Sequence, residues 1–288
     1  MFERVDKILL FTTILLLMSG LVIFGSAALG VLAVNEVKFY SVIKTQLVYA
    51  LLGGSFALYL GIMIPYQLYK KYAYQLFGIA IFVTALVFVP MLSRYHGGAH
   101  RWIDIGPLSL QPSEMLKFTF VIVVAAWCTK YRNVFKDWRY GLLPYMISVG
   151  IVSALLLAQP DFGTYLVIMT ASFVTYFVGG ARKRHIQALV VSGLVGIVLL
   201  IAVRPYMLER VKTFLNSSHD PRGSSWQLNQ SLIALGGGGL TGRGLGQSVQ
   251  KFNYLPEPIG DSIFAVLGEE LGFLGALYII VLYGIVGS

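Results

Sequence analysis

The sequence is dominated by apolar runs long enough to cross a lipid bilayer, and this feature constrains the fold more than any other. A helix of about 20 apolar residues spans the hydrocarbon of a membrane. Runs of about this length occur at residues 8–33, 43–64, 74–92, 113–129, 140–158, 162–180, 186–203 and 262–284. Only 12% of the residues are charged, whereas a soluble domain carries about 25%. The sequence therefore predicts an all-α polytopic integral membrane protein with about eight transmembrane helices.

Eleven of the 22 Lys and Arg residues gather in alternate connections between these runs. They are Arg4, Lys7, Lys70, Lys71, Lys130, Arg132, Lys136, Arg139, Arg182, Lys183 and Arg184. The positive-inside rule places such connections, and with them the N-terminus, in the cytoplasm. The net charge of +9 then reflects membrane orientation and does not indicate a nucleic-acid partner. The first run is too long for a signal-peptide core, so we expect it to be retained as a helix.

This orientation leaves residues 93–112, 159–164 and 204–260 on the outer face, where we expect the chemistry to lie. Residues 204–260 form one long extracytoplasmic loop within a single domain of residues 1–288. In this loop the stretch SSWQLNQSLIALGGGG predicts an amphipathic helix that ends at glycine. The glycines that follow could cradle an anion, but they lack the Lys-Ser/Thr ending of a P-loop.

Three carboxylates surround the start of the last apolar run, in KFNYLPEPIGDSIFAVLGEELGFLG, residues 251–275. Asp261 begins the run, whereas Glu269 lies about 12 Å deeper along a helix and about 80° around its axis. We therefore predict that Glu269 and Glu270 are structural partners of basic or polar groups on neighbouring helices. Asp261 has two open interpretations, a helix N-cap or a surface base, and capping would stabilise its charge and weaken it as a base.

Two further segments place polar residues at the outer face. Arg101 and Trp102 lie in residues 96–118, which form either an interfacial loop or part of a site. In the same segment Lys117 lies about one turn inside a helix, where it reaches the headgroups or pairs with Glu114 or Glu269. Asp161, in the turn AQPDFGTY, either caps its own helix or contacts a pyrophosphate or a metal ion.

The motifs HRWIDIGPLSLQPSEMLK, LAQPDFGT, ERVKTFL, WQLNQSLIALGGGGLTGRGLGQSVQKFNYLPE and GDSIFAVLGEELGFLG, in this order, resemble the SEDS family of shape, elongation, division and sporulation proteins. The resemblance covers residues of about 95–275, and QSVQKFNYLPE is closer to the FtsW branch than to the RodA branch. It implies about ten transmembrane helices, so that this chain would be C-terminally incomplete and lack the last two.

The resemblance also implies a function. Such proteins polymerise peptidoglycan glycan strands from lipid II, a disaccharide-pentapeptide on undecaprenyl pyrophosphate, at the outer face of the bacterial cytoplasmic membrane during division or elongation. They work with a class B penicillin-binding protein. The essential aspartate of the family falls on Asp261, although the usual Thr-Asp-Phe is here Gly260-Asp261-Ser262.

Other matching positions are carried as binding or structural candidates. Arg210, Arg243 and Lys251 are outer-loop cations that could offset the pyrophosphate charge. The binding candidates are Arg101, Trp102, Asp161, Arg210, Arg243, Lys251 and Glu257, and the intramembrane structural candidates are Glu114, Lys117, Glu269 and Glu270. No cofactor is certain, and a divalent cation, Mg²⁺ or Mn²⁺, stays open.

Two other classes of function stay open on the sequence. Charged residues inside helices also mark transport paths, which keeps a transporter or flippase of the lipid-linked precursor as an alternative. A non-catalytic scaffold for cell-wall synthesis is the other. Transporters place paired ionisable residues near mid-membrane, whereas the polar residues here gather at one face, which favours surface chemistry.

Overall fold

The computed structural model describes residues 6–89, 92–96, 99–105, 108–203, 208, 212–213, 225–252 and 254–287. In this part of the chain, five helices are long and apolar enough to cross a membrane: Lys7–Leu32, Glu36–Met63, Pro112–Lys130, Lys183–Ala202 and Ile263–Val286. Shorter apolar helices cover Ala73–Phe88, Leu142–Ala158 and Phe162–Val178. Each of the predicted apolar runs is therefore helical. The residues group into two compact units, one of residues 1–63 and 199–288 and the other of residues 64–198.

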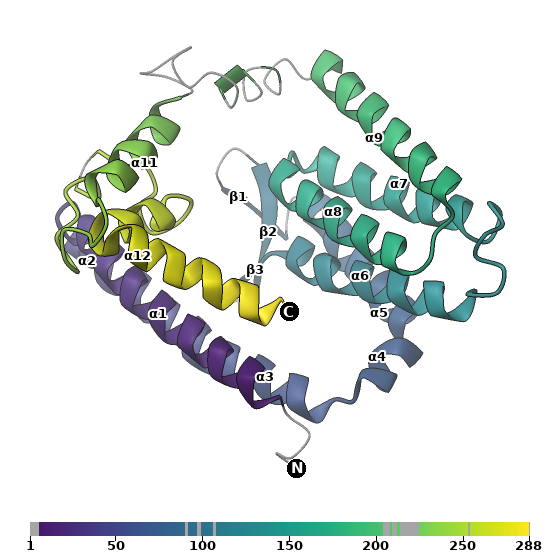
Figure 1. Cartoon of the computed structure of the whole chain (residues 1–288), viewed down its shortest axis with the longest axis horizontal. Helices are drawn as coiled ribbons and strands as arrows, with labels where there is room; N and C mark the ends of the chain where they lie inside the picture. Colours follow the sequence, from purple (N-terminus) through teal and green to yellow (C-terminus); the bar gives the residue numbers. More distant parts are fainter. Residues whose placement is uncertain are drawn as a thin grey trace. The chain divides into compact units, whose positions relative to one another are not determined.

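Unit 1, residues 1–63 and 199–288, is built around α1 (Lys7–Leu32) and α12 (Ile263–Val286). The Asp6 carboxylate starts α1 by accepting hydrogen bonds from the backbone N–H groups of Ile8 and Leu9. The other helices that lie wholly within the described residues of the unit are α2 (Glu36–Leu47), the π-helical η2 (Val48–Gly53), α3 (Gly54–Met63) and α11 (Trp226–Gly237). Figure 1 shows α1 in purple beside α12 in yellow, and α12 also packs against α11.

Small side chains form much of the core where these three helices meet. Ala27 of α1, Ala234 of α11 and Ala265 of α12 are buried together with Val266 and Leu255. Small residues let helix backbones approach closely, which is how apolar helices associate inside a membrane. Leu255 belongs to the loop before α12, so this loop is anchored in the core of unit 1.

Unit 2, residues 64–198, is a helical bundle centred on α6 (Pro112–Lys130). α6 packs against α5 (Ala73–Ala85) and α8 (Phe162–Val178). The remaining described helices that lie in or start in this unit are α4 (Tyr66–Lys71), the 3-10 turn η3 (Leu86–Phe88), α7 (Leu142–Ala158) and α9 (Lys183–Val203). Its core contains stacked aromatic rings, with the Tyr145 and Tyr176 centroids 4.3 Å apart.

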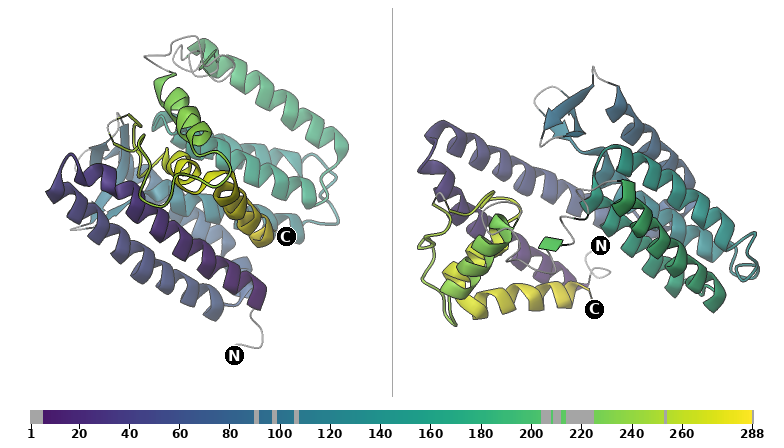
Figure 2. Two further views of the ribbon diagram at one scale, coloured as in Figure 1. Left: turned by 60° about the vertical axis from the view of Figure 1, so that its left-hand side comes forward. Right: turned by 90° about the horizontal axis from the view of Figure 1, so that it is seen from above.

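A small antiparallel sheet, which the sequence did not predict, precedes α6. Its strands are β1 (Ser93–His96), β2 (Ala99–Ile105) and β3 (Leu108–Leu110), in the order β1-β2-β3. Strands this short carry too few alternations of apolar and polar residues to be recognised in a sequence. Figure 2 shows the sheet at one end of the bundle and the basic connection after α6 at the other. Because α6 has 19 residues, about 28 Å of helix separate these ends.

Candidate active site

Asp261 lies on the surface of unit 1, at the end of the loop that leads into α12. The helix begins at Ile263 with Ser262 in the N-cap position, so Asp261 lies one residue too early to cap it. The side chain of Asp261 is exposed and makes no hydrogen bond or ion pair with any described residue. Of the two interpretations of Asp261, the structure therefore favours the surface carboxylate over the N-cap.

The loop around Asp261 is held by backbone and side-chain hydrogen bonds. The carbonyl oxygen of Glu257 accepts from the N–H groups of Gly260, at 3.0 Å, and Ser262, at 3.2 Å. Gln227 of α11 donates its side-chain amide to the Ser262 hydroxyl at 3.2 Å. The Glu257 side chain is exposed. Two exposed carboxylates, those of Asp261 and Glu257, thus share a short loop tied to α11.

The glycine-rich loop after α11 completes a break in the backbone of α12. Gly272 has φ 67° and ψ −165° inside the helix, a conformation open essentially to glycine alone. The N–H groups of Phe273 and Leu274 therefore leave their helical acceptors and bond to the carbonyl oxygens of Gly239, at 2.9 Å, and Leu240, at 3.2 Å.

The carbonyl groups that this break releases are also satisfied by the same loop. The carbonyl oxygen of Glu269 accepts from the N–H of Arg243 at 3.0 Å, and that of Glu270 accepts from the N–H of Gly244 at 2.9 Å. Non-helical backbone at membrane depth needs such partners because no water is available there. The glycine run, which the sequence suggested as an anion cradle, thus supplies the missing backbone partners of α12.

Glu269 and Glu270 follow each other in α12 and are both sealed from solvent, at 1% and 2% exposure. The Glu269 carboxylate accepts from the Ser248 hydroxyl and from the N–H groups of Val249, at 3.1 Å, and Gln250, at 3.2 Å. The Arg243 guanidinium lies 3.6 Å from the Glu269 carboxylate. Every acceptor direction of Glu269 is thus occupied by the loop that precedes α12.

The Glu270 carboxylate binds a buried lysine. The Lys251 ammonium lies 2.7 Å from Glu270 Oε1, and it also donates to the carbonyl oxygen of Gly246 at 2.9 Å and the Ser26 hydroxyl at 3.2 Å. Ser26 of α1 donates to both carboxylate oxygens of Glu270, at 2.8 and 2.6 Å. Lys251 was expected as a substrate-facing cation, and the structure places it in this buried network, at 1% exposure. Ser26 and Ser248 were not singled out from the sequence, because a lone serine carries no recognisable signal.

Of the three candidate cations of the outer loop, Arg243 is the other one that the structure describes. Its side chain is 45% exposed, and its Nε donates to the carbonyl oxygen of Gly237 at the end of α11, at 3.2 Å. Part of the guanidinium therefore remains open to a ligand. Arg210, the third expected cation, lies outside the described residues.

A second polar cluster lies in unit 2, at the turn between α7 and α8. Asp161 caps α8 by accepting from the N–H of Thr164 at 3.3 Å. Its carboxylate also accepts from the side chains of Gln111, at 3.3 Å, and Ser113, at 3.4 Å. The hydrogen bond to Thr164 shows that Asp161 is the N-cap of α8. Its side chain is also buried, at 5% exposure.

Arg101 of β2 ties the small sheet to the same turn. Its guanidinium donates to the carbonyl oxygens of Gln159, at 3.2 Å, and Pro160, at 2.5 Å. Trp102 is half-buried, and its Cα pairs with that of Arg94 in the β1–β2 register. Arg101, Gln111, Ser113 and Asp161 therefore all contact this turn or lie in it, although Arg101 and Asp161 are far apart in the sequence.

Lys117 pairs with Glu114, one of the two partners that the sequence left open. Lys117 Nζ lies 2.8 Å from Glu114 Oε2, and the side chains are 29% and 50% exposed. This is an i,i+3 pair on the surface of α6, where such pairs contribute at most about 1 kcal/mol.

Metal binding was left open by the sequence. Within the ranges that the structure describes, no three His, Cys, Asp or Glu side chains gather closely enough to hold a metal ion.

The chain is similar to known proteins over nearly its whole length. A family model named for FtsW, RodA and SpoVE and described as "cell cycle protein" matches residues 7–287. Stage V sporulation protein E of Bacillus subtilis (strain 168) is 38% identical over 283 residues, which cover 97% of this chain and 76% of that protein. The probable peptidoglycan glycosyltransferase FtsW of Coxiella burnetii is 37% identical over 281 residues, 96% of this chain and 74% of that protein.

Solved structures show the same fold. The crystal structure of the rod shape determining protein RodA of Thermus thermophilus has a TM-score of 0.64 at 28% identity, covering 98% of this chain and 73% of that one. A chain from a study of the structural coordination of polymerization and crosslinking by a peptidoglycan synthase complex has a TM-score of 0.66 at 27% identity. It covers 98% of this chain and 76% of that one.

Proposed function

Because this chain belongs to the FtsW/RodA/SpoVE family of membrane proteins, we propose that it is a peptidoglycan glycosyltransferase. Relatives such as the Coxiella burnetii protein carry that name. The proposed substrate is lipid II, polymerised into glycan strands at the outer face of the bacterial cytoplasmic membrane. The many apolar helices of this multi-pass membrane protein would lie around the lipid tail of that substrate.

The contrast between Asp261 and the two buried glutamates supports this proposal most directly. Glu269 and Glu270 already accept hydrogen bonds from several donors and have no contact with solvent. Asp261 is exposed and has no partner among the described residues. A general base needs a free lone pair within reach of the hydroxyl that it deprotonates. Of these three carboxylates, only Asp261 meets that requirement.

The proposed step is an inverting glycosyl transfer. Asp261 takes the proton of the acceptor's GlcNAc 4-hydroxyl, and that oxygen forms a bond to the anomeric carbon of the donor chain. The bond between this carbon and the pyrophosphate oxygen breaks, and undecaprenyl pyrophosphate leaves. Arg243 is half-exposed and suits a contact with the departing phosphates, and Arg210 is proposed for the same role.

The remaining substrate-binding candidates fall into two groups, according to whether the structure shows their side chains hydrogen-bonded to other parts of the protein. In unit 1 we propose Glu257 as a substrate contact, because its side chain is exposed. Lys251 is hydrogen-bonded inside that unit, so we propose that it supports the loop before Asp261. In unit 2, taken by itself, we propose Trp102 as a substrate contact, because it is half-buried, and we propose that Asp161 and Arg101 hold the turn between α7 and α8.

The activity is tested with the full-length protein and lipid II. Asp261→Asn keeps the size of the side chain and removes the base, so we expect glycan polymer formation to fall at least about 100-fold. Asp137→Asn is the matched control, because the Asp137 carboxylate lies in the connection after α6, where it accepts from the nearby N–H of Arg139. Parallel reactions with EDTA, Mg²⁺ and Mn²⁺ measure the metal requirement.

Normal polymer formation by Asp261→Asn would refute the role of Asp261. If the wild-type protein formed no polymer but moved labelled lipid II across proteoliposomes, the flippase alternative would replace the glycosyltransferase. If it did neither and still bound its partner, the protein would be a scaffold.

We also propose that a class B penicillin-binding protein is the partner of this chain. The structural similarity to a chain from a peptidoglycan synthase complex supports this pairing. Co-purification of the two proteins, followed by assay of lipid II polymerisation with and without the partner, tests it. Failure to co-purify would remove the partner but leave the glycosyltransferase proposal intact.

A further inference from the structure

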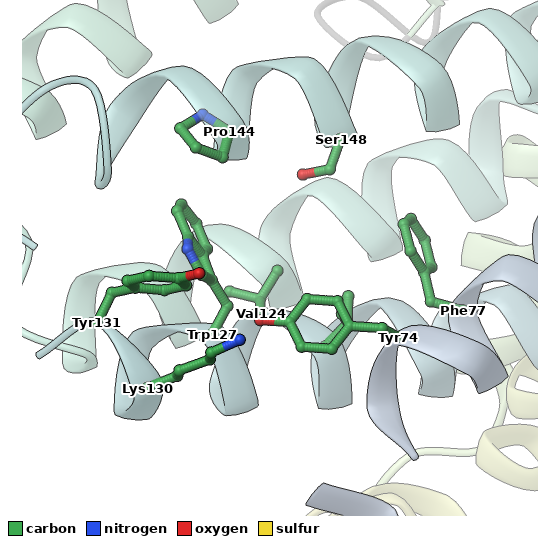
Figure 3. A pocket seen from close by; sticks show the side chains of 9 residues that line it. Tyr74, Phe77, Val124, Trp127, Lys130, Tyr131, Pro144 and Ser148 are labelled. Carbon is green, nitrogen blue, oxygen red and sulfur yellow. The ribbon is translucent and has the colours of Figure 1, made fainter. Parts of the chain in front are cut away.

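Unit 2 contains an open cavity of about 450 Å³ that the proposed glycosyl transfer does not use. It lies between α5, α6 and α7 and is lined by Tyr74, Phe77, Val123, Val124, Trp127, Lys130, Tyr131, Pro144 and Ser148. Figure 3 shows Tyr74 and Phe77 on one side of it, Trp127, Lys130 and Tyr131 on another, and Pro144 and Ser148 across from them. Its volume is within the range of small-molecule sites.

One wall of the cavity is apolar and firmly packed. Val124 and Trp127 of α6 are buried at 2% and 8% exposure. Phe77 of α5 stacks on Phe120, with ring centroids 5.3 Å apart. These groups offer a fixed hydrocarbon surface, which suits an acyl chain better than a polar ligand.

The other end of the cavity carries a cation. Lys130, the last residue of α6, holds its ammonium 5.6 Å from the ring centroid of Tyr74 and 5.3 Å from that of Tyr131. The ammonium makes no ion pair with any residue that the structure describes. The connection that follows adds Arg132, Lys136 and Arg139. The cavity thus combines an apolar wall with an uncompensated positive charge at the helix end.

We propose that this cavity binds a phospholipid with an anionic headgroup. The acyl chain lies against Phe77, Val124 and Trp127, and the phosphate meets Lys130. Basic pockets between transmembrane helices on the cytoplasmic side suit such headgroups, because anionic lipids populate that leaflet. The positive-inside rule assigns the connection after α6 to that side. The site lies wholly in unit 2, whereas Asp261 lies in unit 1, so the two proposals succeed or fail separately.

Lipid binding to the purified, delipidated full-length protein in detergent tests the proposal. Native mass spectrometry is carried out with phosphatidylglycerol, with phosphatidylcholine, and with phosphatidylglycerol in the presence of inorganic phosphate. We expect phosphatidylglycerol to bind more tightly than phosphatidylcholine. Lys130→Met should weaken phosphatidylglycerol binding about tenfold, since it removes a charged hydrogen-bond donor. Ser148→Phe fills the cavity and should abolish the binding.

Lys136→Met is the matched control, because it removes the same charge from the same connection but does not line the cavity. We expect it to change the affinity less than twofold. Equal losses in Lys130→Met and Lys136→Met would overturn the proposal in favour of general attraction to a basic surface. Displacement of the lipid by millimolar phosphate would reassign the site to free anions. Should Ser148→Phe fail to fold, the comparison of the two lysine variants decides alone.

Discussion

The Lys251 ammonium lies 2.7 Å from a Glu270 carboxylate oxygen, with the two residues at 1% and 2% exposure. The hydroxyl of Ser26 bonds to both groups. This buried pair joins α1, the loop before Asp261 and the middle of α12. The loop that leads to the proposed base is therefore anchored by a buried ion pair.

Removal of one member of this pair should destabilise the protein strongly. Lys251→Met leaves the Glu270 charge buried without its partner, which costs about 3–5 kcal/mol. The thermal unfolding temperature of the purified protein should fall clearly. Lys117→Met is the control, because its partner Glu114 is half-exposed and the expected loss is below about 1 kcal/mol. Equal unfolding temperatures for the two variants would show that the buried pair contributes no special stability.

The break in α12 should tolerate no side chain at Gly272. Gly272→Ala forces a Cβ atom onto the backbone of Leu240 and Gly242 and a positive φ onto alanine, which costs about 1–3 kcal/mol for the φ alone. We expect less folded protein and lower thermal stability. Gly284→Ala in the same helix has no atom within 4 Å of the new Cβ and should be neutral or slightly stabilising. Normal stability of Gly272→Ala would contradict the described break.

Asp161 should act through its cap and not through its charge. Asp161→Ala removes the cap of α8 and should cost about 0.5–2 kcal/mol, whereas Asp161→Asn keeps an acceptor for the Thr164 N–H and should cost much less. Thermal unfolding and the KM for lipid II are measured for both variants. A raised KM in Asp161→Asn at unchanged stability would instead show that the charge binds the pyrophosphate.

Cysteine labelling tests the predicted orientation, in which Glu257 lies outside the membrane and Asp137 lies in the cytoplasm. Cys128 is the sole cysteine and is buried, so Cys128→Ala provides a silent background. In intact spheroplasts a membrane-impermeant maleimide should label Glu257→Cys but not Asp137→Cys. Permeabilisation should expose Asp137→Cys. The reverse pattern would invert the proposed topology and place Asp261 in the cytoplasm.

The helices could be predicted from the sequence because the length of an apolar run is a local property. Boundaries differ by a residue or two: the last run was predicted at 262–284, and α12 spans Ile263–Val286. The amphipathic pattern and the terminal glycines predicted the helix α11, whereas the sequence did not predict the short strands β1–β3.

The buried contacts around the candidate site could not be predicted from the sequence. Lys251 is bonded to Ser26 over a separation of 225 positions, and no local pattern connects them. Lys251 therefore looked like an exposed cation of a long loop. The glycine run likewise gave no sign that its carbonyl groups would bond to α12, because that depends on how two segments meet.

The break at Gly272 makes the insertion of α12 into the membrane depend on an earlier part of the chain. Residues 239–244 precede α12 in the chain, and they supply the backbone partners that α12 lacks on its own. An unsatisfied backbone group in hydrocarbon costs several kcal/mol, so α12 alone is a poor substrate for insertion into a bilayer. We therefore expect α12 to become stable in the bilayer only when it pairs with the glycine loop, which has by then reached the outer face.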